Sequence, residues 1–256
     1  MGSLTRVDII MSIIQSCIII VVLAKTVKLT INTRTSVLPF FFALAMGSYL
    51  LSSVYWIAYD FLKPDTRMPM ACNEISEAAV ILLLCAGMDA ILKDREKKVG
   101  EIAFTILFVG ANIALWIAWS EEWLQDILFG IPYIYFCWLV IRGLKSRGSL
   151  SRKELWLSAT ASIMVLALQM PQFFADGKAF KLIEGGNFVI MLALTIWIGV
   201  KSFRRRDFFL TAAFLLWADL FSFLSANFYY YTFSFAYTIA LLLMFSLLKK
   251  EVVADG

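Results

Sequence analysis

The polar residues best placed to do chemistry open the stretch Met68–Lys98. Glu77 follows Asn73 by four residues and Glu74 by three, spacings that place side chains on one face of a helix. A carboxylate beside an amide suits a small cation, and two crowded carboxylates favour uptake of a proton. This cluster therefore predicts a cation or proton site. The alternative is that Asn73 or Glu74 caps the helix start, where negative charge is favoured.

A second carboxylate and amide repeat this spacing, because Glu184 and Asn187 are three residues apart. Glu77 lies sixteen residues before Lys93, and Glu184 lies seventeen residues before Lys201. At 1.5 Å per helical residue, both acids stand about 24–26 Å from those lysines. We therefore expect them near the outer edge of the membrane, where they either form an acidic entrance or are solvated among the headgroups.

Asp219 is the single most informative acid. It follows Arg206 by thirteen residues, which predicts a position near the middle of the membrane. A charged side chain there costs roughly 2.5–3.5 kcal/mol on insertion scales, so it is expected to face a wet or ligand-filled space. Asp219 is thus a candidate ion site, proton relay or ligand counter-ion. The alternative is a structural hydrogen bond to a neighbouring helix, made by a protonated carboxyl.

Aromatic residues gather where the predicted spans reach the outer side of the membrane. Ring faces of this kind can cage a cation. They also form the belts that anchor helices at membrane interfaces, so both interpretations stand. The candidates for an aromatic pocket are Trp56, Tyr59, Trp116 and Trp119.

Several kinds of chemistry are not predicted. The chain has no histidine, its four cysteines are scattered, and no phosphate-binding loop, nucleophile elbow or zinc-protease pattern occurs. Met68, Met70 and Cys72 are soft ligands, but no second cluster supports a copper site. We therefore expect no metal, no cofactor and no catalytic residue. An enzyme that acts on lipid through paired carboxylates is the third-ranked function.

The elements that must position these residues are membrane helices. Hydrophobic residues make up 61% of the 256-residue chain and charged residues 16%, against roughly 45–50% and 25% in soluble domains. Runs of about 20 apolar residues suffice to cross a bilayer. The sequence predicts an all-α polytopic transmembrane helix bundle that forms a single membrane domain over residues 1–256. Its nine spans are expected near Val7–Ala24, Ser36–Tyr59, Met70–Leu92, Val99–Trp119, Leu124–Ile141, Leu155–Phe174, Leu182–Val200, Phe208–Asn227 and Tyr231–Leu248.

The basic residues predict the orientation. Eighteen of the 23 Lys and Arg residues fall in the loops after spans one, three, five and seven and in the C-terminal tail. Short basic loops stay in the cytoplasm, so the N-terminus is expected outside and the C-terminus inside the plasma membrane. After the first span the chain is compatible with four hairpin repeats, because the tetrapeptides Trp56–Tyr59 and Trp116–Trp119 occupy the same outer corner.

These patterns favour two functions. The first is a transporter of a small molecule or ion, with a cationic substrate or a proton held by the acids. The alternative is a receptor or sensor that binds an outside ligand and signals to a separate cytoplasmic partner. Membrane lipid is an expected partner of the chain, and nucleic acid is not, because the positive charge follows the cytoplasmic loops.

Overall fold

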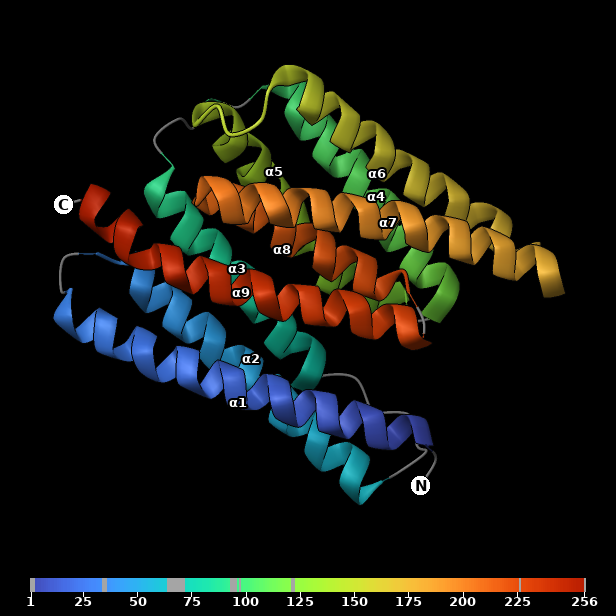
Figure 1. Cartoon of the computed structure of the whole chain (residues 1–256), viewed down its shortest axis with the longest axis horizontal. Helices are drawn as coiled ribbons and strands as arrows, with labels where there is room; N and C mark the ends of the chain where they lie inside the picture. The colour runs from blue at the N-terminus through green and yellow to red at the C-terminus, as the bar shows by residue number, and fades with distance from the viewer. Residues whose placement is uncertain are drawn as a thin grey trace. The chain divides into compact units, whose positions relative to one another are not determined.

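The computed structural model describes residues 3–33, 36–63, 72–92, 96, 98–120, 123–225 and 227–255. Every regular element within these ranges is an α-helix, which confirms the all-helical prediction (Figure 1). In chain order the helices are α1 (Ser3–Asn32), α2 (Leu38–Leu62), α3 (Cys72–Ile91), α4 (Val99–Ser120), α5 (Trp123–Ser146), α6 (Arg152–Gln172), α7 (Gly177–Arg205), α8 (Phe208–Phe223) and α9 (Asn227–Asp255).

Six of these helices contain segments long and apolar enough to cross a membrane. Within the described residues, the segments are Ile9–Asn32, Leu38–Tyr59, Val99–Trp119, Trp123–Ser146, Gly177–Arg205 and Tyr229–Val252. The chain therefore has the length and composition of a helical membrane protein. The remaining helices are α3, α6 and α8, and for them a full crossing stays a prediction.

Helix α8 is the clearest departure from the predicted spans. The apolar run predicts a helix to Asn227, but α8 ends at Phe223. Its 16 residues cover about 24 Å, which is less than the roughly 30 Å of a hydrocarbon core. The last turn is loosened by hydroxyl competition, because Ser222 Oγ donates to the carbonyl of Asp219 at 2.7 Å. Gln169 of α6 then donates its Nε2 to the Leu224 carbonyl at 3.2 Å and satisfies this helix end.

The helices pack as two compact units, and the first comprises residues 1–91, 127–136 and 248–256. Within it α1 packs against α2, and α2 packs against α3 (Figure 1). A side chain larger than hydrogen at Gly87 of α3 would meet Leu38 of α2 at 3.0 Å. The absence of a side chain at Gly87 therefore permits the close approach of α2 and α3.

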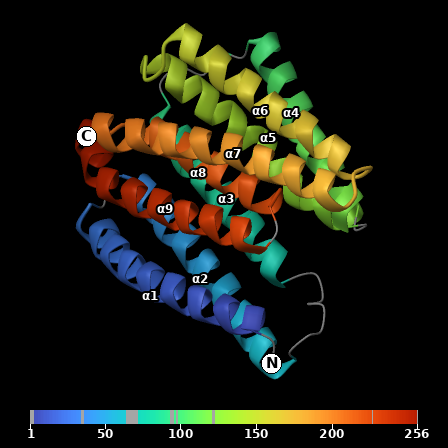
Figure 2. The same ribbon diagram turned by 45° about the vertical axis from the view of Figure 1, so that its right-hand side comes forward.

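The second unit comprises residues 92–126 and 137–247. Within it α6 packs against α7, α7 against α8, and α4 against α6 (Figure 2). Helix α8 is apolar on all sides, and all its residues except Asp219 and Phe223 are buried. A methyl group at Gly199 of α7 would lie 3.2 Å from the ring of Phe214, so α7 and α8 are in close contact there.

Candidate ligand-binding cavity

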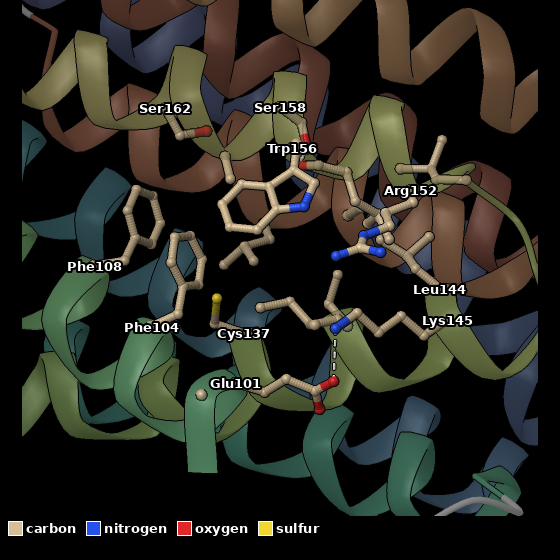
Figure 3. Close-up of a pocket in the computed structure, with 18 of the residues that line it drawn as sticks. Glu101, Phe104, Phe108, Cys137, Leu144, Lys145, Arg152, Trp156, Ser158 and Ser162 are labelled. Atoms are coloured by element: carbon tan, nitrogen blue, oxygen red, sulfur yellow. Dashed lines mark hydrogen bonds and ion pairs between the residues drawn. The ribbon is translucent and has the colours of Figure 1, made fainter. Parts of the chain in front are cut away.

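A cavity of about 700 Å³ lies in the second unit and is lined by residues of α4, α5, α6 and α8 and of the adjoining loops (Figure 3). Its volume falls in the range of roughly 300–1,000 Å³ that small-molecule sites occupy. Most of the wall is aliphatic or aromatic, with rings from Phe104, Phe108 and Trp217. The rings of Phe104 and Phe108 are parallel, with centroids 5.7 Å apart. The wall can therefore accommodate a flat or extended apolar body.

The charged side chains of the cavity lie at one end only. In Figure 3 the side chains of Glu101, Lys145 and Arg152 lie on one side of the cavity, and those of Phe104 and Phe108 lie on the other. Among the described residues that line it, the cations are Lys98, Lys145 and Arg152, and the one carboxylate belongs to Glu101. The lining therefore combines an apolar interior with a positively charged end.

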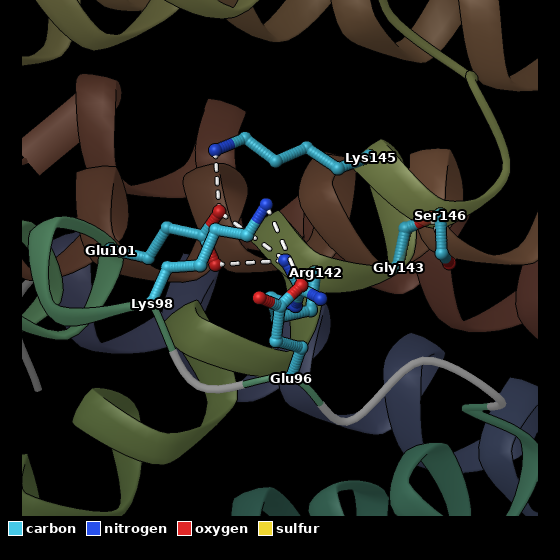
Figure 4. A network of polar contacts seen from close by, with 7 residues as sticks. All are labelled: Glu96, Lys98, Glu101, Arg142, Gly143, Lys145 and Ser146. Atoms are coloured by element: carbon cyan, nitrogen blue, oxygen red, sulfur yellow. Dashed lines mark hydrogen bonds and ion pairs between the residues drawn. The ribbon is translucent and has the colours of Figure 1, made fainter.

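Glu101 organises this charged end (Figure 4). Its Oε1 accepts a hydrogen bond from Lys145 Nζ at 2.6 Å, and its Oε2 accepts one from Arg142 Nη1 at 3.2 Å. Arg142 is 2% exposed and Glu101 is 7% exposed, so this ion pair is buried. The first turn of α4 suits the carboxylate because the helix dipole is positive there. One carboxylate thus neutralises Arg142 and leaves Lys145 in excess.

Arg152 supplies another cation of the charged end. It is the first residue of α6, which is fixed by Ser151 at the N-cap and by Glu154 in a reciprocal capping box. The Arg152 side chain points toward the indole of Trp156, one turn further along α6 (Figure 3). No described residue forms a hydrogen bond or an ion pair with Arg152. Its guanidinium is therefore available to a ligand.

Ser162 adds a polar atom at the other end of the cavity. Its side chain lines the wall, is 3% exposed, and has no hydrogen-bond partner for Oγ among the described residues. Ser162 and Arg152 are ten residues apart on α6, which is about 15 Å along the helix axis. A buried hydroxyl without a partner costs about 1–3 kcal/mol. A ligand or a water that reached Ser162 would recover that free energy.

Three contacts tie the loop beside the cavity and the first turn of α6 to the C-terminal part of α7 and to the α7–α8 connection. Glu154 pairs with Lys201, Arg205 Nη1 donates to the Ser149 carbonyl at 2.7 Å, and Arg147 lies 3.9 Å from an Asp207 oxygen. The Lys201 hydrogen bond, with help from the Ser151 amide, lowers the pKa of Glu154 to about 2. The start of α6 is therefore held to α7 by one ion pair, between Glu154 and Lys201, that needs an ionised Glu154.

The predicted acids lie elsewhere in the fold, and none of them lines this cavity. Glu77 is half-buried on α3, and its Oε1 accepts a hydrogen bond from Ser52 of α2 at 3.4 Å. The backbones of Asn73 and Glu74 belong to α3, but their side chains lie outside the described residues. The predicted cluster of three therefore stays a prediction. Met68, Met70 and the side chain of Cys72 also lie outside the described residues.

In the second unit Glu184 is half-buried, whereas Asn187 is buried. Asn187 Nδ2 donates to the Val165 carbonyl of α6 at 3.3 Å, so this amide connects α6 and α7. Asp219 is half-buried, four residues before the end of α8. Asp219 is therefore one of two residues of α8 that are not buried.

The four aromatic candidates have different environments. Trp56 and Tyr59 are half-buried on α2, and the ring of Tyr59 lies 6.2 Å from that of Tyr55. Trp116 is buried against Phe223 with ring centroids 5.4 Å apart. Trp119 is 47% exposed, and its ring centroid lies 4.5 Å from that of Phe173. Burial of Trp116 favours a packing role for that ring.

Sequence reasoning missed the residues that define the cavity. It counted Lys98, Arg142, Lys145 and Arg152 only as loop charges that report orientation. A signal for the site was present, since Glu101 is the third residue of an apolar run that otherwise has no charge up to Trp119. A buried carboxylate requires a cation, and the loop after the next span offers several.

The fold and this cavity define the class to which the chain belongs: a helical membrane protein with an amphipathic pocket. Within the described residues, no group of three or more metal-ligating side chains is present. Comparison with models of known families, with curated proteins and with solved structures gives no match.

Proposed function

We propose that this chain is a nine-span transporter of the plasma membrane and that its substrate binds in the cavity of the second unit. The observation that carries this proposal is a 700 Å³ space with apolar walls and one charged end. Such a space fits a small molecule better than a bare ion, because most of its lining cannot replace water around a charge. The N-terminus lies outside and the C-terminus inside, so the basic end of the cavity faces the cytoplasm.

Nine spans are supported by charge and by packing together. The basic residues alternate between sides only if every apolar run crosses. The three helices that are too short or too polar to be obvious spans pack against others: α3 on α2, and α6 and α8 on α7. Neighbouring helices can supply the contacts that a short or polar span needs inside a membrane.

In this proposal the acidic residues couple substrate transport to the uptake of a proton or a small cation. Glu77, Glu74 and Asn73 on α3, Glu184 and Asn187 on α7, and Asp219 on α8 take up a proton or a small cation during transport. Glu77, Glu184 and Asp219 are not fully buried, and a carboxylate at membrane depth is a default candidate for such a role. Flux that is unchanged by Asp219→Asn would remove Asp219 from the mechanism.

Transport is tested with two membrane-impermeant probes that share a ring system and differ in charge. The probes are 2-naphthalenesulfonate and (2-naphthylmethyl)trimethylammonium, loaded into proteoliposomes that contain the full chain. We expect protein-dependent efflux of at least one probe. Ala159→Trp places an indole in the cavity wall and should abolish efflux, whereas Thr160→Trp on the exposed face of α6 should not. Efflux of neither probe, or efflux that Ala159→Trp leaves intact, would contradict the proposal.

A receptor or sensor is the second candidate, and the contacts between Glu154 and Lys201 and between Arg147 and Asp207 favour it. The first connects the start of α6, a cavity-lining helix, to α7, and the second connects the turn after α5 to the α7–α8 connection, so a bound ligand could change the face offered to a cytoplasmic partner. This candidate predicts probe binding without probe efflux.

A further inference from the structure

We propose that the cavity recognises an amphipathic anion, which has an apolar body, one acidic group at one end and a hydrogen-bonding atom at the other. This inference rests on the cavity being the ligand site proposed above, and it names the class of ligand. It differs from the cationic substrate that the acids of α3, α7 and α8 suggest.

The charge of the lining carries the first part of the inference. The described lining has a net charge of +2, because Lys98, Lys145 and Arg152 face one carboxylate. That carboxylate is already bonded to the buried Arg142 and to Lys145, so it has little negative potential left to attract a ligand cation. A sulfonate, carboxylate or phosphate monoester would instead accept charge-assisted hydrogen bonds from Arg152.

The apolar wall carries the second part. Beyond the charged end the lining includes Phe104, Phe108, Leu155 and Trp217, which offer no charge to a ligand. Burial of an apolar body there contributes roughly 25 cal/mol for each Å² removed from water. An inorganic anion has no such body, so it should bind far more weakly than an amphipathic one.

Ser162 carries the third part. Its buried, unpartnered Oγ lies about 15 Å along α6 from Arg152, at the opposite end of the wall. A ligand that spans the two residues, with an acid near Arg152 and a hydroxyl near Ser162, would satisfy both. An analogue that lacks the distal hydroxyl would leave Ser162 Oγ without a hydrogen-bond partner from the ligand.

Binding of labelled probes to the full chain in nanodiscs tests the charge. We expect 2-naphthalenesulfonate to bind at least tenfold more tightly than (2-naphthylmethyl)trimethylammonium. Arg152→Gln should weaken binding of the sulfonate about tenfold, and Arg152→Lys should restore much of it. The matched control is Lys153→Gln, which removes an exposed neighbouring cation that does not line the cavity and should change affinity less than twofold. Equal loss in both glutamine variants would show a general surface attraction and overturn the inference.

The distal hydroxyl is tested by comparing two probes, with and without a hydroxyl, on the unaltered chain and on Ser162→Ala. We expect the unaltered chain to bind 6-hydroxy-2-naphthalenesulfonate several-fold more tightly than 2-naphthalenesulfonate. We expect Ser162→Ala to bind the two probes with equal affinity. A gain that survives in Ser162→Ala would remove Ser162 from the recognition site.

The source of the natural anion is tested by competition. 2-Naphthyl phosphate, a water-soluble phosphate monoester, is supplied from the water, and dodecyl phosphate is supplied within the nanodisc lipid. Displacement of the labelled sulfonate by either supports the inference, and preferential displacement by dodecyl phosphate assigns the anion to the lipid phase. Failure of both overturns it.

The outcomes separate this inference from the proposed function. If the ammonium probe binds better than the sulfonate, and Ala159→Trp abolishes its binding, the cavity remains the ligand site and the anion is wrong. If the sulfonate binds as expected but is not carried across, the anion stands and the transporter proposal falls.

Discussion

Glu101 has two bonds to cations and little exposure to water, so its removal should have a large effect. Glu101→Gln would remove the charge of the carboxylate that pairs with the buried Arg142, and breaking a buried ion pair typically costs about 3–5 kcal/mol. We therefore expect a large fall in the temperature at which the detergent-solubilised protein unfolds. Asp176→Asn is the matched control, because Asp176 is exposed and its side chain makes no capping hydrogen bond; it should leave that temperature nearly unchanged.

The double variant Glu101→Leu with Arg142→Met separates charge from packing. Replacement of both partners by apolar residues removes the desolvation cost along with the attraction, so the double variant should be more stable than Glu101→Gln alone. If the double variant is the less stable of the two, the attraction between the charges outweighs their desolvation.

Glu154 predicts a dependence of stability on pH. Lys201 lowers the pKa of the Glu154 carboxyl to about 2, from its ordinary value of 4.5, so the ionised form is favoured in the folded protein. The contribution of this pair is therefore complete above pH 4.5 and is lost as the pH falls from 4.5 toward 2. Glu154→Gln keeps the capping hydrogen bond but not the charge, so its unfolding temperature should lie below that of the unaltered chain at pH 6. That difference should shrink by pH 3, and a difference that is constant over this range would contradict the assignment.

At the scale of single residues, the sequence predicts which side chains are costly to bury but not which partners they find. Glu77 and Asp219 are conspicuous because they interrupt apolar runs. Arg142 is not, because its place at the end of a run resembles that of any cytoplasmic basic residue. Its burial depends on α5 continuing to Ser146 and on α4 presenting Glu101, and neither is visible in local spacing.

At the scale of elements, the contact of α5 with α8 depends on a glycine. An ideal Cβ at Gly143 of α5 would fall within the ring of Phe209 of α8. That ring is buried and lies 4.9 Å below the guanidinium carbon of Arg147, so it has little freedom to move. Gly143→Ala should therefore destabilise the protein by about 1–3 kcal/mol despite the higher helix propensity of alanine.

Gly110→Ala is the control for this contact. Gly110 is in α4, and a Cβ there meets nothing within 4 Å. This variant should be as stable as the unaltered chain or more stable by up to about 1 kcal/mol. Thermal unfolding of both variants, with Phe209→Ala added to Gly143→Ala to relieve the overlap, distinguishes a steric effect from a loss of backbone flexibility.

Helix positions follow from the sequence more closely than helix ends do. Each predicted run corresponds to a helix because some twenty apolar residues leave the backbone no partner in a membrane except itself. The ends depend on capping contacts. Helix α6 begins at a recognisable Ser151–Glu154 capping box, whereas the early end of α8 involves Gln169, which is 55 residues away in sequence from Leu224.

At the scale of the whole molecule, apolar runs and loop charges predict the number and direction of the helices but not their grouping. The two units divide α5, since residues 127–136 belong to one and residues 137–146 to the other. Apolar faces are nearly interchangeable in lipid, so packing is decided by small residues and polar contacts that no single run displays.

The orientation of the chain determines which side of the membrane the cationic end of the cavity faces. In a background in which the four cysteines are replaced by serine, we introduce Asp176→Cys or Lys153→Cys, both at exposed positions next to helix starts. The charge distribution places Asp176 outside and Lys153 inside. In intact cells a membrane-impermeant maleimide should therefore label Asp176→Cys at once and Lys153→Cys only after permeabilisation. Labelling in the reverse order would show that every span has the opposite orientation. The anion would then reach Arg152 and Lys145 from outside the cell.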